Sequence, residues 1–180
     1  MPKIASVFGG SAPQPGSPPY EEARRLGALL ARSGWTVATG GYSGVMAAAS
    51  HGACEAGGHV VGVTCELIET WRDLRANEWV KEEIRFRTLR ERLYHLVEFC
   101  DAALAMPGGI GTLSEIALIW SLMQINEIRR KPFVVIGRVW GETISTFIRE
   151  SDGYLHPGDN QLIQIADNVE EAVRHIADSR

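Results

Sequence analysis

A glycine-rich segment between a short apolar run and a long apolar helical pattern constrains the fold most strongly. The sequence Pro107-Gly108-Gly109-Ile110-Gly111-Thr112 follows the apolar residues 102–106 and leads into a helical pattern over Gly111–Asn126. A strand that passes through a glycine turn into a helix exposes backbone N–H groups at the positive end of the helix dipole, where phosphate binds. The segment therefore predicts an α/β fold with an anion site at a strand end.

Two further glycine turns support this prediction. Gly9-Gly10-Ser11 follows an apolar run from Lys3, and Gly40-Gly41-Tyr42-Ser43-Gly44 lies between the run Trp35–Thr39 and a small-residue helical pattern. One such turn often serves only the geometry of the connection, but three at strand ends favour a phosphate site. Neither the Gly-x-Gly-x-x-Gly pattern with a following acid nor a Gly-Lys-Ser/Thr P-loop occurs, so dinucleotide and NTPase functions are disfavoured.

Apolar runs alternate with helical patterns along the whole chain. Predicted strands cover residues 3–8, 35–39, 59–64, 102–106, 132–137 and 162–165, and predicted helices cover 20–33, 45–56, 88–99, 111–126, 140–150 and 169–178. The segment Cys65–Phe86 has no clear period and is expected to be loop and irregular helix. The alternation predicts one Rossmann-like domain over residues 1–180, with a doubly wound, mostly parallel sheet flanked by helices.

Composition limits the partners and the compartment. The 180 residues carry a formal net charge of −4, which disfavours nucleic acid as a partner because many phosphates need a basic surface. The three cysteines show no paired spacing, and the five histidines show no metal-ligand spacing. No apolar run has the length of a membrane span. We therefore expect a cytoplasmic protein with reduced thiols, without a membrane partner, a metal or another cofactor.

Two charged residues near the richest turn have a structural and a functional interpretation. Glu115 lies three residues after Thr112, where a carboxylate is either a favourable charge at a helix start or a group that faces the ligand. Arg92 lies on a predicted helix close to Arg87 and Arg90, and a row of arginines is usually a solvated face.

The motifs together resemble the Lonely Guy (LOG) family of phosphoribohydrolases. Residues 107–115 match the family signature PGGxGTxxE, residues 7–11 are similar to its VFCGS, and residues 40–46 are similar to its GGGSxGLM. The likeness extends from about Lys3 to about Phe147. Family members release cytokinin bases from nucleoside 5′-monophosphates, and many were formerly described as lysine decarboxylases.

The resemblance implies the roles of particular residues. The family's catalytic arginine falls on Arg92 and its catalytic glutamate on Glu115. The implied substrate-binding residues are Ser11, Gly40, Gly41, Ser43, Gly44, Gly108, Gly109, Ile110, Gly111, Thr112 and Ser121. This chain departs from the family at Tyr42, Leu89, Leu93 and Ser114, mostly around the expected base and sugar.

The resemblance also implies the reaction and the assembly. The expected function is hydrolysis of the N-glycosidic bond of a purine nucleoside 5′-monophosphate, of cytokinin or adenosine type, in a homodimer or higher homo-oligomer. The alternatives are a non-catalytic nucleotide or molybdenum-cofactor carrier of the same fold, and a nucleotide-sensing subunit.

Three tryptophans and two glutamates are further candidates. Trp120 is expected in the core or at a subunit interface. Trp71 and Trp79 are open to either a structural or a base-stacking role, and Glu66 or Glu69 is a candidate substrate contact.

Overall fold

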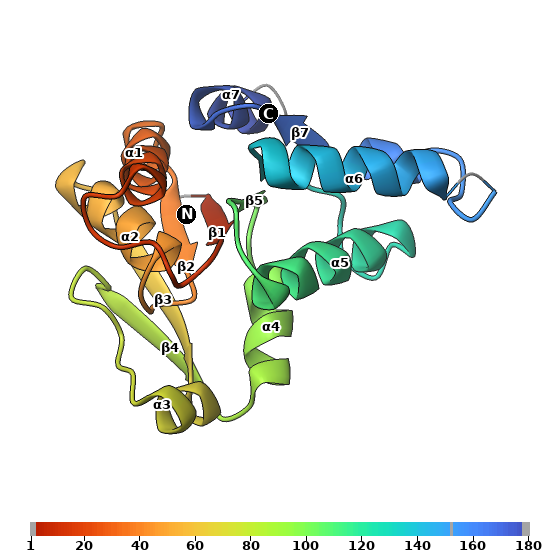
Figure 1. The fold of residues 1–180 in the computed structure, drawn as a ribbon. Coiled ribbons are helices and arrows are strands. Elements are labelled where there is room, and N and C mark those ends of the chain that lie inside the picture. The colour runs from red at the N-terminus through yellow and green to blue at the C-terminus, as the bar shows by residue number, and fades with distance from the viewer. Residues whose placement is uncertain (1–2, 152, 178–180) are drawn as a thin grey trace.

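A parallel sheet of seven strands forms the centre of the structure, a computed structural model that describes residues 3–151 and 153–177 (Figure 1). The strand order is β4-β3-β2-β1-β5-β6-β7, and all neighbouring pairs run parallel. The strands are β1 (Ile4–Phe8), β2 (Thr36–Thr39), β3 (Val60–Cys65), β4 (Glu82–Phe86), β5 (Ala102–Ala105), β6 (Phe133–Ile136) and β7 (Gln164–Ala166). The predicted single-domain, Rossmann-like α/β fold is confirmed.

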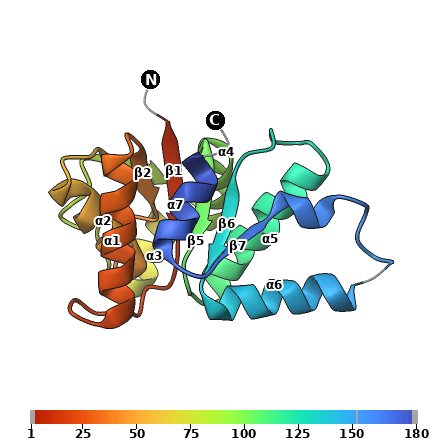
Figure 2. The ribbon, with the colours of Figure 1, turned by 90° about the horizontal axis from the view of Figure 1, so that it is seen from above.

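Helices cover both faces of the sheet, and each face has its own apolar cluster. Helices α1 (Pro18–Arg32), α2 (Val45–Glu55) and α7 (Val169–Ala177) pack on one face, and α4 (Leu89–Glu98), α5 (Ile110–Gln124) and α6 (Arg138–Glu150) pack on the other (Figure 2). A 3₁₀ turn, η1 (Asp159–Leu162), precedes β7. None of the helices within the described ranges is long and apolar enough to cross a bilayer.

The central strands are buried on both sides, as their residue types predict. Every residue of β2 and β5 is buried, and all of β1 after Ile4 is buried. A parallel sheet covered on both faces favours continuous apolar runs of this kind. The buried hydroxyl of Ser6 donates to the carbonyl oxygen of Leu96 at 2.9 Å, so the polar group inside the core has a partner.

The expectation for residues 65–86 was wrong in one respect, because this segment contains the strand β4. Its sequence, Glu-Glu-Ile-Arg-Phe, leaves Glu82, Glu83 and Arg85 exposed. A strand at the edge of a sheet commonly carries charged side chains, so β4 lacks the apolar run that identifies the inner strands. The last strand also lies slightly later than predicted, with Leu162 in η1, and Asp178 falls outside the described residues.

The chain changes direction across the sheet between β1 and β5. After β1 the chain continues through α1 to β2 on one side, whereas after β5 it continues through α5 to β6 on the other. In open α/β sheets, ligands bind in the crevice outside the carboxyl ends of the strands at such a reversal. The turn after β1 and the turn after β5 therefore meet at the position where this fold forms its site.

Helix α4 is fixed at both of its ends. At the start, Thr88 Oγ1 accepts from the amide of Glu91, and the Glu91 carboxylate accepts in return from the amide of Thr88. This reciprocal pairing is a capping box. At the other end, the buried ammonium group of Lys131 donates to the carbonyl oxygens of Val97 and Cys100 at 2.8 Å each. The position of α4 matters because this helix carries Arg92.

Candidate functional site

The glycine turns after β1, β2 and β5 are hydrogen-bonded to one another. The amide of Gly10 donates to the carbonyl oxygen of Pro107 at 3.1 Å, and the Gly10 carbonyl oxygen accepts from the amide of Val45 at 2.9 Å. Ser43 Oγ donates to the carbonyl oxygen of Ser11 at 3.1 Å. The three turns thus form one connected unit at the carboxyl edge of the sheet, with the turn after β1 in the middle.

Close contacts within the protein leave no room for a side chain at Gly108 or at Gly40. A Cβ atom at Gly108 would lie 2.2 Å from Thr112 Oγ1 and 2.8 Å from the amide nitrogen of Gly10. A Cβ atom at Gly40 would lie 2.0 Å from Nη2 of Arg92. Neither glycine lines the pocket described below. Gly108 instead permits the close approach of two turns, and Gly40 leaves room for the arginine.

The other predicted glycines divide into two kinds. Gly41 and Gly44 have φ angles of 79° and 67°, in the left-handed region that glycine adopts without a steric penalty. Gly109 and Gly111 have no atom within 4 Å of the place where a Cβ would stand. Gly41 and Gly44 therefore shape the turn after β2, whereas Gly109 and Gly111 leave open space at the start of α5.

A pocket of about 650 Å³ opens beside these turns. Its walls come from the turns after β1 and β5, from the first turn of α5, from α4 and from the helix α3 (Glu66–Arg72). The first amides of an α-helix have no acceptor within the helix, so the start of α5 offers N–H donors to an anion. The predicted site residues that line the pocket are Ser11, Arg92, Gly109, Ile110, Gly111, Thr112 and Glu115.

Arg92 is buried, with only 6% of its surface exposed. Its Nε donates to the carbonyl oxygen of Val63 at 2.7 Å, and its Nη2 donates to that of Gly40 at 3.2 Å. Its guanidinium carbon also lies 5.6 Å from the centre of the Tyr42 ring. Arg92 therefore does not belong to a solvated row of arginines. Its spacing of four residues from the buried Leu96 could have indicated this, since residues i and i+4 share a helix face.

Glu115 is buried on the same pocket, one turn into α5. Burial raises the pKa of the Glu115 carboxyl to about 7, against the opposing effect of the Arg92 guanidinium. A carboxyl group with this pKa exchanges its proton readily near neutral pH, which is the property of a general acid or base. The two residues that the resemblance marks as catalytic thus interact electrostatically within one pocket.

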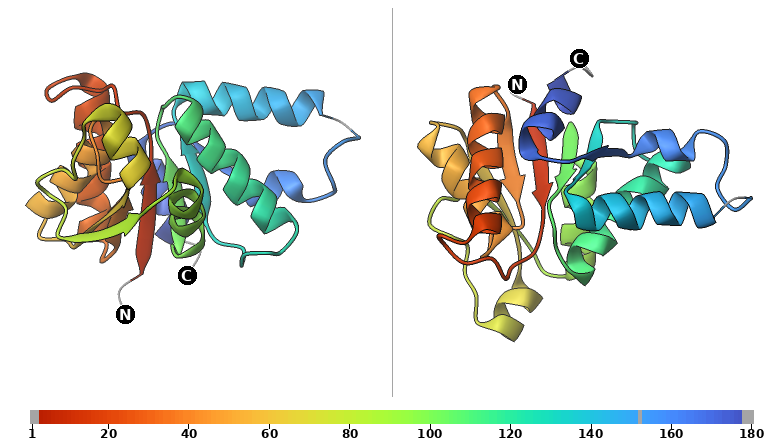
Figure 3. Two further views of the ribbon diagram at one scale, coloured as in Figure 1. Left: turned by 90° about the horizontal axis from the view of Figure 1, so that it is seen from below. Right: turned by 45° about the horizontal axis from the view of Figure 1, so that its top comes forward.

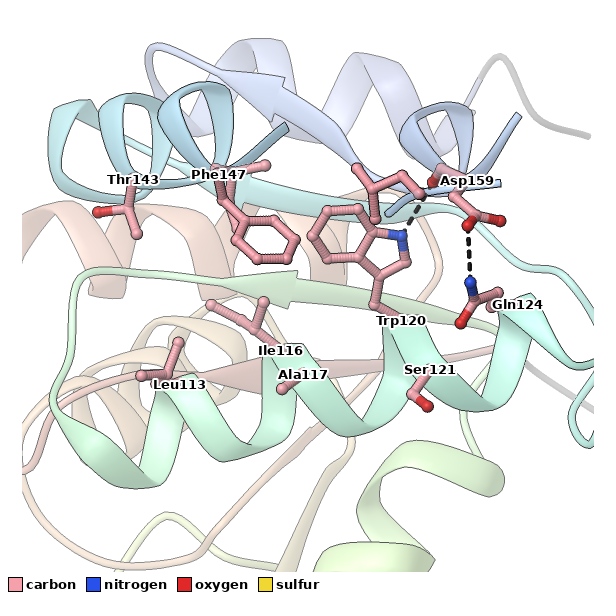
Figure 4. Close-up of a pocket in the computed structure, with 11 residues that line it drawn as sticks. Leu113, Ile116, Ala117, Trp120, Ser121, Gln124, Thr143, Phe147 and Asp159 are labelled. Atoms are coloured by element: carbon pink, nitrogen blue, oxygen red, sulfur yellow. Dashed lines mark hydrogen bonds between the residues drawn. The ribbon is translucent and has the colours of Figure 1, made fainter. Parts of the chain in front are cut away.

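Ser121 lies in a different place. It lines a second, apolar pocket of about 300 Å³ between α5 and α6, together with Trp120 and Phe147 (Figure 4). Six residues of α-helix correspond to a rotation of roughly 600°, or about 240° after one full turn, so Ser121 and Glu115 face different directions. Ser121 does not line the pocket that contains Arg92 and Glu115. Its role as a substrate contact stays a prediction.

The second pocket also contains the predicted core tryptophan. Trp120 is 9% exposed, and its Nε1 donates to the carbonyl oxygen of Asp159 at 2.9 Å. Its ring meets Phe147 edge-on at a centroid distance of 5.7 Å, and nearby Gln124 donates to the Asp159 carboxylate (Figure 4). These contacts fasten the far end of α5 to η1, in agreement with a core position for Trp120.

Residues 65–77, here called the α3 segment, are hydrogen-bonded at both ends to the turn after β2. The Tyr42 hydroxyl accepts from the amide of Cys65 at 2.7 Å and lies 3.2 Å from its carbonyl oxygen. At the other end, the amide and Nδ2 of Asn77 donate to the carbonyl oxygen of Gly41 at 2.8 and 2.9 Å. The α3 segment thereby brings a helix beside the pocket, and Figure 3 shows α3 projecting beyond the sheet.

Helix α3 supplies pocket residues that the sequence interpretation did not assign. Leu67, Ile68, Trp71 and Arg72 all line the pocket. Leu67 and Trp71 are four residues apart, as are Ile68 and Arg72, and this spacing places each pair along one side of the helix. Leu67 and Trp71 are 60% and 76% exposed. The open question about Trp71 is therefore answered in part, since this ring lies at the pocket.

Two of the remaining candidates of this region, Trp79 and Glu69, have structural contacts. Trp79 stacks on His51 at a centroid distance of 4.3 Å, away from the pocket lining. Glu69 is buried and forms an ion pair with Arg85 on β4 at 2.5 Å, which ties α3 to the sheet. Glu66 is exposed. Across the described ranges, no cluster of three or more His, Cys, Asp or Glu side chains is placed to hold a metal ion.

Comparisons with known proteins show which family and fold this chain shares. A cytokinin riboside 5′-monophosphate phosphoribohydrolase from Mycobacterium tuberculosis is 31% identical over 164 residues, covering 88% of this chain and 86% of that protein. A phosphoribohydrolase of the same name from Rhodococcoides fascians is 27% identical over 181 residues, covering 97% and 89%. Among solved structures, the molybdenum cofactor binding protein from Rippkaea orientalis superposes with a TM-score of 0.76 at 26% identity, covering 99% of this chain and 97% of that one.

A family model described as possible lysine decarboxylase matches residues 46–176, which include Arg92, the glycine turn after β5 and Glu115. This match covers more than half of the chain, and the phosphoribohydrolase relatives extend along most of it. The chain therefore belongs to the Lonely Guy family, the group formerly described as lysine decarboxylases.

Proposed function

We propose that this protein hydrolyses the N-glycosidic bond of purine nucleoside 5′-monophosphates, to release the free base and ribose 5-phosphate. One observation carries the proposal most directly. A buried carboxyl group with a pKa of about 7 and a buried arginine share a pocket with the amino-terminal end of α5. Binding of a phosphate requires only the helix end and its turns, whereas the Glu115–Arg92 pair supplies groups for a reaction.

The phosphate is the part of the ligand that the glycine turns would hold. The residues at the start of α5, including Thr112, line the pocket. Their backbone amides and the Thr112 hydroxyl are groups suited to phosphate oxygens. Glu115 lies three residues further along the same helix, about one turn away. A ligand anchored by its 5′-phosphate at this helix end would therefore place its sugar near the carboxylate.

The chemistry at the sugar uses the ionised form of Glu115. Departure of the base from C1′ builds positive charge on the ribose ring, and a nearby carboxylate stabilises such an oxocarbenium-like transition state. A water molecule then adds to C1′, while the departing base takes up a proton. Glu115 would stabilise the developing charge or orient this water molecule, and Arg92 would hold ribose or phosphate oxygens with its guanidinium fork.

The relatives support a reaction of this type, since two of them carry the name of the phosphoribohydrolase. The competing proposal is a carrier that binds a phosphorylated cofactor without turnover, and the similar protein from Rippkaea orientalis is named as a molybdenum cofactor binding protein. A carrier needs the phosphate site, but it has no use for a buried carboxyl group that titrates near neutral pH. We therefore favour the hydrolase.

The deciding experiment is an assay of ribose 5-phosphate release from a panel of nucleoside 5′-monophosphates, including AMP and an N6-prenylated AMP. We expect release from at least one purine nucleotide and none from the matching nucleosides. The Glu115→Gln variant serves as the control for contaminating hydrolases. Binding of nucleotides without release of any base would reject the hydrolase in favour of the carrier.

A further inference from the structure

Arg72, the last residue of α3, brings a second guanidinium group to the pocket. It lines the pocket together with Ser11 and the start of α5. Its Nη1 donates to Ser11 Oγ at 3.3 Å, and Ser11 belongs to the connected glycine turns. The guanidinium also lies against the neighbouring Trp71, with its central carbon 4.8 Å from the ring centre. These two contacts hold the cation at the phosphate end of the pocket.

The charges of the pocket lining leave Arg72 without a counter-ion. Arg92 and Glu115 have opposite charges and interact with each other, and the guanidinium of Arg92 is already bonded to two carbonyl oxygens. Within residues 3–151 and 153–177, no carboxylate forms an ion pair with Arg72. By contrast, Arg85 is paired with Glu69 on the same helix. Arg72 is therefore the excess positive charge in a pocket suited to an anion.

We propose that Arg72 is a specificity-determining residue that binds the 5′-phosphate of the ligand and so distinguishes nucleotides from nucleosides. Its guanidinium group, positioned by Ser11 and Trp71, donates to a phosphate oxygen that the amides of α5 bind from another wall. The proposal rests on the proposed function for the identity of the ligand, a nucleoside monophosphate, but it does not depend on hydrolysis.

The architecture around α3 gives this interaction a fixed geometry. The α3 segment is closed onto the turn after β2, and that turn is bonded to the turn after β1. Arg72 and the amides at the start of α5 are therefore carried by parts of one connected framework. Arginine suits this position because its planar fork donates to Ser11 and to a phosphate oxygen from different nitrogen atoms.

The test is calorimetric titration of AMP and adenosine into an Arg72→Gln variant, with Glu115→Gln present in all proteins to prevent turnover. We expect AMP to bind about tenfold to a hundredfold more weakly, the loss typical of a hydrogen bond to a charged group, while adenosine affinity stays the same. Arg72→Lys keeps the charge and loses the guanidinium fork, so its affinity for AMP should lie between those of the native Arg72 protein and Arg72→Gln. Arg75→Gln is the matched control, because Arg75 lies outside the pocket lining and donates to the carbonyl oxygen of Leu74.

Three results would overturn the proposal. Arg72→Gln could leave the affinity for AMP unchanged, or it could weaken the binding of AMP and of adenosine equally. The protein with native Arg72 could also show no preference for AMP over adenosine. Equal losses would mark Arg72 as a support of α3, and thermal unfolding would then show a matching loss of stability. The same comparison of Arg72 and Arg72→Gln can be made by titrating ribose 5-phosphate into proteins with native Glu115, because this ligand has no N-glycosidic bond to hydrolyse. Release of ribose 5-phosphate from AMP is measured separately, so the hydrolase proposal and the Arg72 proposal fail independently.

Discussion

The carboxyl group of Glu115 has to lose a proton in a place where burial disfavours the charge. Replacing it with Gln keeps the shape of the side chain and removes the charge that would face the developing cation. Losing such preorganised stabilisation typically costs on the order of a hundred- to a thousandfold in turnover. We expect this loss in kcat for ribose 5-phosphate release by Glu115→Gln, with AMP affinity retained because the α5 amides are unchanged.

Arg92 provides the comparison for that variant. Arg92→Ala should weaken AMP binding as well as turnover, since its guanidinium would contact the ligand before and during the reaction. The double variant should lose less than the product of the two single effects, because residues that act as a unit are not additive. Wild-type turnover by Glu115→Gln would leave the hydrolase without its catalytic carboxylate.

The same carboxyl group links stability to pH. Its pKa is about 7 in the folded protein and 4.5 in the reference state, so the folded protein binds more protons between these values and its stability falls as pH rises from 4.5 to 7. Above pH 7 the full cost of the buried charge is present, about 3 kcal/mol. We expect Glu115→Gln to unfold at a higher temperature than the native protein at pH 8, with the difference shrinking towards pH 4.5. Equal unfolding temperatures at both pH values would contradict this.

At the scale of the elements, substitutions at two glycines should affect activity and stability differently. A Cβ atom at Gly40 would meet the end of the Arg92 side chain at 2.0 Å, whereas one at Gly27 would meet the carbonyl oxygen of Ala49 at 2.0 Å, where α1 packs on α2. A side chain can move more easily than packed backbone. We expect Gly40→Ala to lose most activity with little loss of stability, and Gly27→Ala to lose about 1–3 kcal/mol of stability while kcat is kept.

Chemical denaturation and the ribose 5-phosphate assay measure the two effects on the same preparations. The pair serves as its own control, because both changes add one methyl group to a glycine that packs closely. The prediction fails if Gly40→Ala has native activity or if Gly27→Ala has native stability.

Local features of the sequence predicted most of the elements that enclose the proposed phosphate site. Glycine at a strand end and apolar periodicity are properties of a few neighbouring residues, so the turns of β1, β2 and β5 and the helices after them could be located. The contribution of α3 could not be located in this way. It depends on contacts of Tyr42 with Cys65 and of Asn77 with Tyr42, which are 23 and 35 residues apart in the chain.

The pattern of β4 and the position of Ser121 illustrate the same limit. The charged edge strand has no apolar run, and its identity depends on pairing with β3. The substrate contact of Ser121, which stays a prediction, comes from a correspondence of sequence positions, and such a correspondence does not show which way a side chain faces around the helix axis. The burial of Arg92, by contrast, was accessible from its helical phase with Leu96.

At the scale of the whole molecule, the family resemblance predicts a homodimer that uses helices next to the site. Leu113 on α5 and Phe147 on α6 are 41% and 49% exposed at the apolar groove between these helices. We expect light scattering at micromolar concentration to give about twice the chain mass of 19.7 kDa. Leu113→Glu should shift the protein towards monomer, whereas Val139→Glu, at an exposed apolar residue outside the groove, should not. A monomeric native protein would contradict the prediction.

The hydrogen bonds at both ends of the α3 segment determine whether the segment loses its conformational entropy during folding or on ligand binding. Because both ends of the α3 segment are hydrogen-bonded to Gly41 and Tyr42 of the same chain, we expect this wall to become ordered during folding, so that the ligand encounters a prepared surface. Amide hydrogen exchange of residues 66–77 should therefore be slow already in the free protein and change little when AMP is added. A large gain in protection on binding would show a wall that orders around its ligand. A prepared wall favours rapid capture of nucleotide over adaptation to ligands of different shapes.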